Sequence, residues 1–140
     1  MRYAHIALQL AKQAHKGQKD KAGKDYIQHP IHVAEQMQTD IEKTVAYLHD
    51  VVEDTDVTLS LLQEMGFPGE VVDAVDAITK RSGEEYNDYL QRVVGNPIAR
   101  KVKIADMEHN SDITRFENPT EKDKERCNKY KTKILQISTH

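Results

Sequence analysis

Apolar residues recur along the chain at the three- and four-residue spacing of an α-helix, whereas the alternation typical of a β-strand is scarce. Near the N-terminus, for example, Ala4, Ala7 and Ala11 share one predicted helical face, with Ile6 and Leu10 beside it. This spacing predicts helices over residues 3–14, 30–37, 41–52, 59–66, 68–79, 86–94, 97–109 and 121–137.

The residues at the ends of these segments support the same organisation. Pro30 suits the first turn of a helix, where its missing N–H costs nothing, and Asp40, Thr58 and Thr120 are suited to cap helices. No internal repeat, low-complexity tract or long linker divides the chain. The sequence therefore predicts an all-α fold, a compact single domain over residues 1–140 built from about seven or eight helices.

Composition and charge narrow the class of protein. The 140 residues are 38% hydrophobic and 31% charged, which is ordinary for a soluble helical protein with a real core. A net charge of -3 does not favour a general nucleic-acid-binding protein, which usually carries a basic excess. No stretch approaches the ~18 consecutive apolar residues of a membrane span, and the N-terminus lacks a signal peptide's apolar centre. We expect a cytoplasmic protein that binds neither nucleic acid nor membrane, and we leave its oligomeric state open.

The single cysteine, Cys127, cannot form an internal disulfide, which fits a reducing compartment. It lies among charged residues of the last predicted helix. We therefore expect Cys127 to be a solvated helix residue without a chemical role.

Four polar groups follow one another at the end of the predicted helix over residues 41–52. These are His49, Asp50, Glu53 and Asp54. In a continuous helix His49 would lie near Glu53, and Asp50 near Asp54, because residues four apart share a face. Such groups in half-buried surroundings repel one another and lose hydration unless a cation or a ligand compensates them. The pattern predicts a metal site.

Two other segments supply partners for this site. His29 stands just before a predicted helix, and Asp106 follows an apolar turn, with Asn110 one turn later on the same face. Together with His49 and Asp50 they offer two imidazoles and two carboxylates. Such mixed ligands suit Mn, Fe, Co, Ni or Zn better than Ca, which prefers oxygen.

Each of these residues also has a structural interpretation when it is taken alone. Asp106 could accept hydrogen bonds from a neighbouring helix, Asn110 could end its own helix, and Glu53 with Asp54 could form a solvated helix end. A lone histidine is more often a surface or core residue than a ligand. We apply that interpretation to His5, His15, His32, His109 and His140.

The same residues carry a resemblance to a known family. The matching blocks are AHKGQ at 14–18, DYIQHPIHVA at 25–34, LHDVVEDT at 48–55 and VKIADMEHN at 102–110. In these blocks the chain resembles the HD-domain phosphohydrolases, and among them the small alarmone hydrolases related to the hydrolase half of RelA/SpoT proteins. The resemblance spans nearly the whole chain and implies an HD-type helical bundle.

The resemblance also implies roles for individual residues. It implies that one divalent metal, Mn(II), is bound by His29, His49, Asp50 and Asp106. It implies that Glu53 and Asp54 position or activate the attacking water, and that Lys21 and Asn110 contact the nucleotide. The reaction of the family is removal of pyrophosphate from the 3′ position of guanosine tetra- or pentaphosphate, and some small members are linked to phosphate removal from NADPH.

One position departs from the family pattern. Where an arginine is expected immediately before Lys21 to pack against the base, this chain has Asp20. An acid cannot stack as a guanidinium does, and it repels phosphate. Asp20→Arg is therefore predicted to improve the use of guanine nucleotides.

Three hypotheses follow for the function of this chain, and each has a small-molecule nucleotide as the ligand. The main one is a metal-dependent phosphohydrolase of 3′-pyrophosphorylated guanosine nucleotides. The first alternative is the same centre acting on another nucleotide, for example NADPH. The second is a nucleotide-sensing module without turnover, which has no need of the acid pair Glu53 and Asp54.

Overall fold

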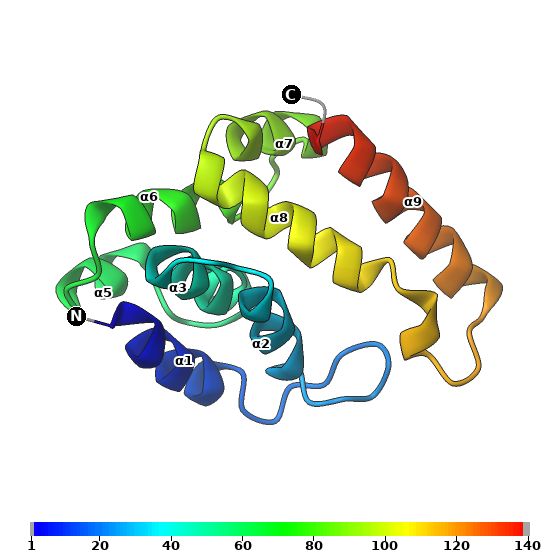
Figure 1. Ribbon diagram of the computed structural model, residues 1–140, viewed down its shortest axis with the longest axis horizontal. Helices are drawn as coiled ribbons and strands as arrows, with labels where there is room; N and C mark the ends of the chain where they lie inside the picture. Colours follow the sequence, from blue (N-terminus) through cyan, green and yellow to red (C-terminus); the bar gives the residue numbers. More distant parts are fainter. Residues whose placement is uncertain (1, 139–140) are drawn as a thin grey trace.

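The computed structural model describes residues 2–138, and over this range the chain forms α-helices joined by loops and one short 3-10 helix (Figure 1). The elements are α1 (Tyr3–Ala14), α2 (Gln28–Glu35), α3 (Asp40–Leu48), α4 (Val51–Asp54), α5 (Leu59–Glu64), α6 (Gly69–Ile78), α7 (Tyr86–Val94), α8 (Pro97–Asn110), η1 (Ile113–Arg115) and α9 (Glu121–Ser138). The described residues contain no β-strand, so the prediction of an all-α fold is confirmed.

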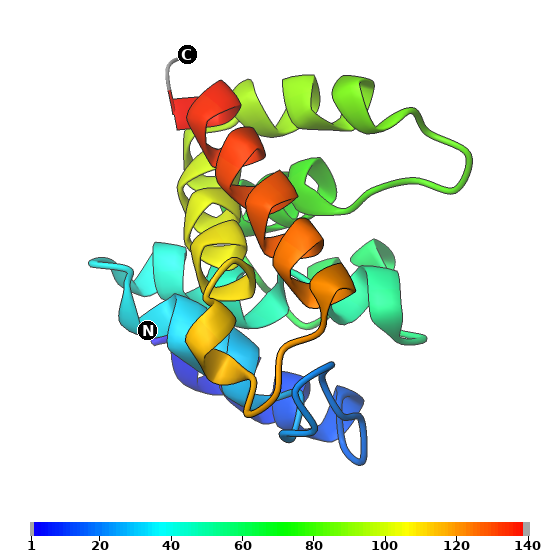
Figure 2. The same ribbon diagram turned by 90° about the vertical axis from the view of Figure 1, so that its right-hand side faces the viewer.

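Helix α3 lies at the centre of the bundle and packs against α1, α2, α6 and α8. Its residues Val45, Ala46 and Leu48 are fully buried. Complete burial of a leucine side chain contributes ~1.5–3 kcal/mol, so the end of α3 that precedes the predicted metal ligands is held firmly in the core. Helix α8 crosses this layer, and Figure 2 shows α9 running along its outer side.

The predicted helix over residues 41–52 is interrupted in the structure. Helix α3 ends at Leu48, and α4 begins only at Val51. The imidazole Nδ1 of His49 lies 2.5 Å from the carbonyl oxygen of Ala46 and donates to it. That side-chain bond takes up one of the carbonyls at the C-terminal end of α3, where the helix leaves carbonyls without an intrahelical donor. The expectation of one continuous helix through His49 and Asp50 is therefore wrong.

The cap predicted for this helix is also different. Thr39, not Asp40, caps α3: its side chain accepts from the N–H of Glu42, and the Glu42 carboxylate accepts from the N–H of Thr39. The carboxylate of Asp40 instead accepts the N–H groups of Tyr3 at 2.9 Å and Ala4 at 3.3 Å. Asp40 therefore caps α1, a helix that receives no cap bond from the side chain of its own N-cap residue.

The other predicted boundaries agree well with the structure. Thr58 accepts from the N–H of Leu61 at the start of α5, and Thr120 accepts from the N–H of Asp123 at the start of α9. Cys127 is a correction, since it is buried in the core and its Sγ donates to the carbonyl oxygen of Asn110. It faces α8 because α9 packs against that helix. Among residues 2–138, no helix is both long and apolar enough to cross a membrane.

The cap that Asp40 supplies to α1 gives a test of the fold. Asp40→Ala leaves two N–H groups at the start of α1 without their acceptor, so we expect a loss of ~1–2 kcal/mol in the free energy of unfolding, measured by urea denaturation. Asp73→Ala, at an exposed position of α6, is the matched control and should change stability by less than ~0.5 kcal/mol. Equal stability of the two variants would contradict the assigned cap.

Candidate metal centre and active site

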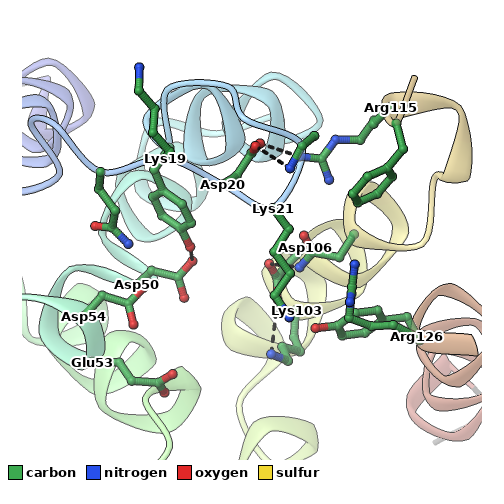
Figure 3. A pocket seen from close by; sticks show the side chains of 16 residues that line it. Lys19, Asp20, Lys21, Asp50, Glu53, Asp54, Lys103, Asp106, Arg115 and Arg126 are labelled. Carbon is green, nitrogen blue, oxygen red and sulfur yellow. Dashed lines mark hydrogen bonds and ion pairs between the residues drawn. The ribbon is translucent and has the colours of Figure 1, made fainter. Parts of the chain in front are cut away.

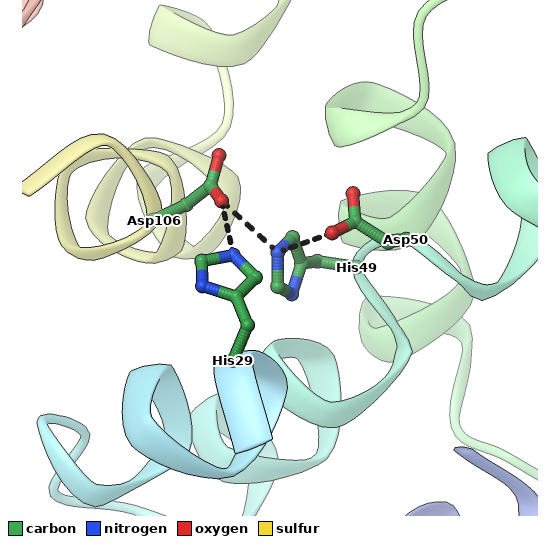
Figure 4. A group of neighbouring side chains, drawn as sticks. All are labelled: His29, His49, Asp50 and Asp106. Atoms are coloured by element: carbon green, nitrogen blue, oxygen red, sulfur yellow. Dashed lines mark hydrogen bonds and ion pairs between the residues drawn. The ribbon is translucent and has the colours of Figure 1, made fainter. Parts of the chain in front are cut away.

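The four residues predicted as metal ligands come together in the interior of the bundle (Figure 4). His29 comes from α2, His49 and Asp50 from the break between α3 and α4, and Asp106 from α8. Each offers one ligand atom, and these atoms all lie within 4.8 Å of one another. The four residues could therefore hold a single divalent cation, as their mixed nitrogen and oxygen donors also suggest.

The carboxylate of Asp106 contacts both histidines of the cluster. Its Oδ1 lies 2.6 Å from His29 Nε2 and 3.3 Å from His49 Nε2, while Oδ2 lies 3.1 Å from Lys103 Nζ. Burial by itself would raise the pKa of Asp106, but Lys103 and the two histidines outweigh it and hold this pKa well below its usual value. Asp106 is therefore an ionised carboxylate in the core, which is what a cation requires of a ligand.

His49 presents its second nitrogen to the same point. Because the carbonyl of Ala46 can only accept, His49 Nδ1 carries the proton of that bond and Nε2 faces the carboxylates. Asp50 Oδ2 lies 3.0 Å from Nε2. Burial opposes ionisation of Asp50 as well, yet the neighbouring His49 lowers its pKa to about 2. The ionised carboxylate of Asp50 next to His49 Nε2 is therefore suited to a place beside a cation.

Tyr26 supports the centre from the loop side, a role that the sequence did not reveal. Its hydroxyl donates a short hydrogen bond to Asp50 Oδ2. Burial and the nearby Asp50 raise the pKa of Tyr26 far above its usual value, so the phenol remains a donor. The buried ring of His15 packs against the Tyr26 ring with centroids 4.8 Å apart.

The predicted acid pair borders a pocket of about 650 Å³ that opens beside the cluster (Figure 3). Glu53 and Asp54 lie on the same side of this pocket as Asp50. One carboxylate oxygen of Glu53 accepts the N–H of Lys80 at 2.8 Å. Partial burial, together with Asp50 and Glu53, raises the pKa of Asp54 to about 6. The pair therefore stands at the pocket wall next to the cluster, although α4 and not α3 carries it.

Basic side chains line other parts of the pocket. Both predicted substrate contacts, Lys21 and Asn110, line it, and Asn110 Nδ2 also donates to Asp106 Oδ1 at 3.2 Å. Four further lining residues were not predicted from the sequence, and two of them are arginines opposite the acid pair (Figure 3): Arg115, Phe116, Arg126 and Tyr130. The one feature of the sequence that could have indicated them is their position after the VKIADMEHN block. An acidic end and a basic wall suit a polyanionic substrate approaching a cation.

Asp20 does not stand in the pocket as an unpaired acid. Its Oδ2 pairs with Arg115 Nη2 at 2.8 Å, and its Oδ1 accepts the N–H groups of Ala22 at 2.9 Å and Lys24 at 3.0 Å. Gly23 completes this turn with a φ of 83°. The inference that Asp20 repels phosphate is thus corrected, because its charge is compensated by a guanidinium that lines the same pocket.

The remaining histidines differ from one another. His5 is exposed, and His140 lies outside the described residues. His109, interpreted from sequence as an ordinary surface or core residue, lies with Nδ1 2.7 Å from His29 Nδ1, and its ring stacks on His32 with centroids 3.9 Å apart. Burial and the adjacent Arg115 lower the pKa of His109 to about 3, so it is neutral.

Two bacterial proteins illustrate the sequence relatives of this chain. It is 36% identical over 126 residues to a probable GTP pyrophosphokinase of Mycobacterium leprae, a match covering 81% of this chain and 16% of that protein. It is 39% identical over 100 residues to the guanosine-3′,5′-bis(diphosphate) 3′-pyrophosphohydrolase of Vibrio cholerae, covering 69% of this chain and 14% of that protein. The chain thus spans about a sixth of the length of these relatives.

A solved structure shares the fold of this chain. It is that of a metazoan ortholog of SpoT that hydrolyzes ppGpp, and it matches with a TM-score of 0.78 at 22% identity over 98% of this chain and 85% of that one. The HD domain model matches residues 7–88, which is more than half of the sequence and includes His29, His49 and Asp50. The chain therefore belongs to the HD domain family.

Proposed function

We propose that this chain is a hydrolase dependent on Mn(II), which removes pyrophosphate from the 3′ position of guanosine tetra- or pentaphosphate. The placement of a buried two-histidine, two-carboxylate cluster beside an acid pair and a basic wall, in one pocket, carries the proposal. The Vibrio cholerae relative, which is named for that activity, supports the choice of substrate. His29, His49, Asp50 and Asp106 would hold the cation.

The chemistry divides between the cation and the chain. When bound, the cation would supply Lewis acidity at the phosphoryl group. Glu53, with one oxygen held by the N–H of Lys80, keeps its other oxygen to accept a proton from the attacking water, and Asp54 orients that water. The water oxygen bonds to the phosphorus attached to O3′, the bond between that phosphorus and O3′ breaks, and O3′ takes up a proton. The products are pyrophosphate and GDP or GTP.

Side chains of the basic wall would bind the negative charges of the substrate. Lys21 is exposed at the pocket and free to reach a phosphate, and Asn110 is held by Asp106 at the base of the pocket. Arg115 and Arg126 lie across from the acid pair (Figure 3). Arginine offers planar, paired donors that match phosphate geometry, so these two residues suit a substrate that carries phosphate groups.

A nucleotide panel separates this proposal from its two alternatives. Purified protein with Mn(II) is incubated with ppGpp, pppGpp, NADPH and other nucleotides, and the products are resolved by ion-exchange chromatography. Release of pyrophosphate and GDP from ppGpp supports the proposal. Turnover of another nucleotide alone would support the first alternative, and binding without any turnover would support the sensing module.

The ligand assignment predicts a joint loss of metal and activity. His49→Ala removes an imidazole from a buried set and leaves its carboxylate neighbours uncompensated, so we expect Mn(II) affinity to fall by more than ~100-fold and turnover to vanish. Metal content after dialysis is measured by inductively coupled plasma mass spectrometry. His5→Ala, at an exposed histidine of α1, is the control and should retain full metal content.

The role proposed for Glu53 predicts that a substitution there slows turnover without reducing metal binding. Glu53→Gln keeps an oxygen for the N–H of Lys80 but cannot take a proton, so kcat should fall ~10²–10⁴-fold at unchanged metal content. Glu70→Gln, in the first turn of α6, serves as the control and should have wild-type kcat. A Glu53→Gln enzyme as fast as the wild type would remove Glu53 from the mechanism.

The ion pair between Asp20 and Arg115 changes the prediction for Asp20→Arg, which from sequence was expected to improve the use of guanine nucleotides. This substitution places two guanidinium groups together and removes the acceptor of two loop N–H groups, so KM for ppGpp should rise about 10-fold instead of improving. Asp25→Arg, which breaks an exposed ion pair in the same loop, is the control and should change KM less than ~3-fold. A lower KM for Asp20→Arg would restore the original interpretation.

Several expectations from the sequence remain predictions. They are a single domain over residues 1–140, Mn(II) as the bound ion, a cytoplasmic location, and a nucleotide as partner without nucleic acid or membrane. The oligomeric state stays open.

A further inference from the structure

Each of the two ring nitrogens of His29 contacts the side chain of a different residue of α8. Nε2 lies 2.6 Å from Asp106 Oδ1 within the ligand cluster, and Nδ1 lies 2.7 Å from His109 Nδ1. The two rings are nearly parallel, at 11° to each other with centroids 4.9 Å apart. His29 is therefore held on its outer side by a second imidazole, which is not one of the cluster's four ligands.

A contact between two imidazole nitrogens needs one proton, which must sit on one of the two rings. If His109 donated it, a neutral His29 would carry its proton on Nε2 and donate it to Asp106 Oδ1, which leaves no lone pair on Nε2 for a cation. If His29 donates it, Nε2 presents a lone pair to the cluster. His49 already follows the second pattern, with Nδ1 donating to the carbonyl of Ala46. Only the second arrangement lets both histidines act as ligands.

We propose that His109 is a positioning residue for the metal centre: its Nδ1 accepts the Nδ1 proton of His29 and keeps the Nε2 lone pair of His29 directed at the cation. The inference rests on the proposed function only for the presence of a cation, not for the nucleotide. His109 must then carry its own proton on Nε2. It does for His29 what a backbone carbonyl does for His49.

The surroundings of His109 support this arrangement. The ring contacts His29 through Nδ1 and stacks on His32, with ring centroids 3.9 Å apart and the planes at 17°. Arg115 Nη1 donates to the backbone carbonyl of His109 at 3.0 Å, which fixes the main chain at this end of α8. His109 also lines a hollow of about 300 Å³ that Asp20 and Arg115 border, so its ring has access to water.

Two substitutions at position 109 separate acceptance of the proton from simple packing. His109→Asn keeps an oxygen close to the position of Nδ1, whereas His109→Leu keeps comparable bulk without an acceptor. Mn(II) affinity is measured by competition with a chelator in the absence of nucleotide. We expect the Leu variant to bind ~10–100-fold more weakly and the Asn variant to recover to within ~3-fold of the wild type, as for other residues that orient a metal ligand.

The matched control is His32→Leu, which removes the stacking partner of His109 but no contact to His29, and it should bind Mn(II) as the wild type does. Wild-type affinity in both position-109 variants would overturn the inference. Equal loss in both would also overturn it, because packing and not the acceptor would then be responsible.

A spectroscopic measurement on the unmodified chain gives an answer even if a variant does not fold. In protein labelled with ¹⁵N-histidine and loaded with diamagnetic Zn(II), long-range ¹H–¹⁵N correlations report which nitrogen of His109 carries the proton. A proton on Nε2 supports the inference, and a proton on Nδ1 overturns it. Neither readout uses turnover, so a negative nucleotide panel would defeat the proposed function and leave this test unaffected.

Discussion

The buried carboxylate of Asp106 joins the fold to the site. It lies within hydrogen-bond distance of the Nε2 atoms of His29 of α2 and His49 at the end of α3, and it accepts from Lys103 and Asn110 of its own helix. An isolated charge in the core costs several kcal/mol, so α2, α3 and α8 must pack in a register that brings all these partners to one carboxylate. The same packing that satisfies Asp106 assembles the cluster that could hold a cation.

Helix α3 ends where His49 and Asp50 join the cluster. Buried Val45, Ala46 and Leu48 anchor the helix, and the side chain of His49 then bonds back to the carbonyl of Ala46. Helix α3 ends there, and the separate turn of α4 that follows carries Glu53 at the pocket wall. An ideal helix through this segment would be more regular, but it would aim the acid pair differently with respect to the cluster.

Features that concern substrate binding and the positioning of His29 depend on partners far apart in the chain. The loop before α2 is tied to η1 by the pair between Asp20 and Arg115, two residues 95 positions apart in the chain. The same arginine reaches the backbone of His109, whose ring contacts the ligand cluster. The substrate wall, the loop and the outer support of His29 are therefore physically connected, and a substitution in one is expected to affect the others.

The sequence by itself determined the helical class, most helix boundaries and the four residues of the cluster. Periodicity and caps such as Thr58 depend on neighbours within a few residues, and the HD blocks carry their chemistry in fixed local spacing. Only the tertiary structure decided that Asp40 caps α1, that Cys127 is buried, and that His109 supports His29. Those outcomes depend on partners 36, 17 and 80 residues away, which local pattern cannot specify because packing alone brings them together.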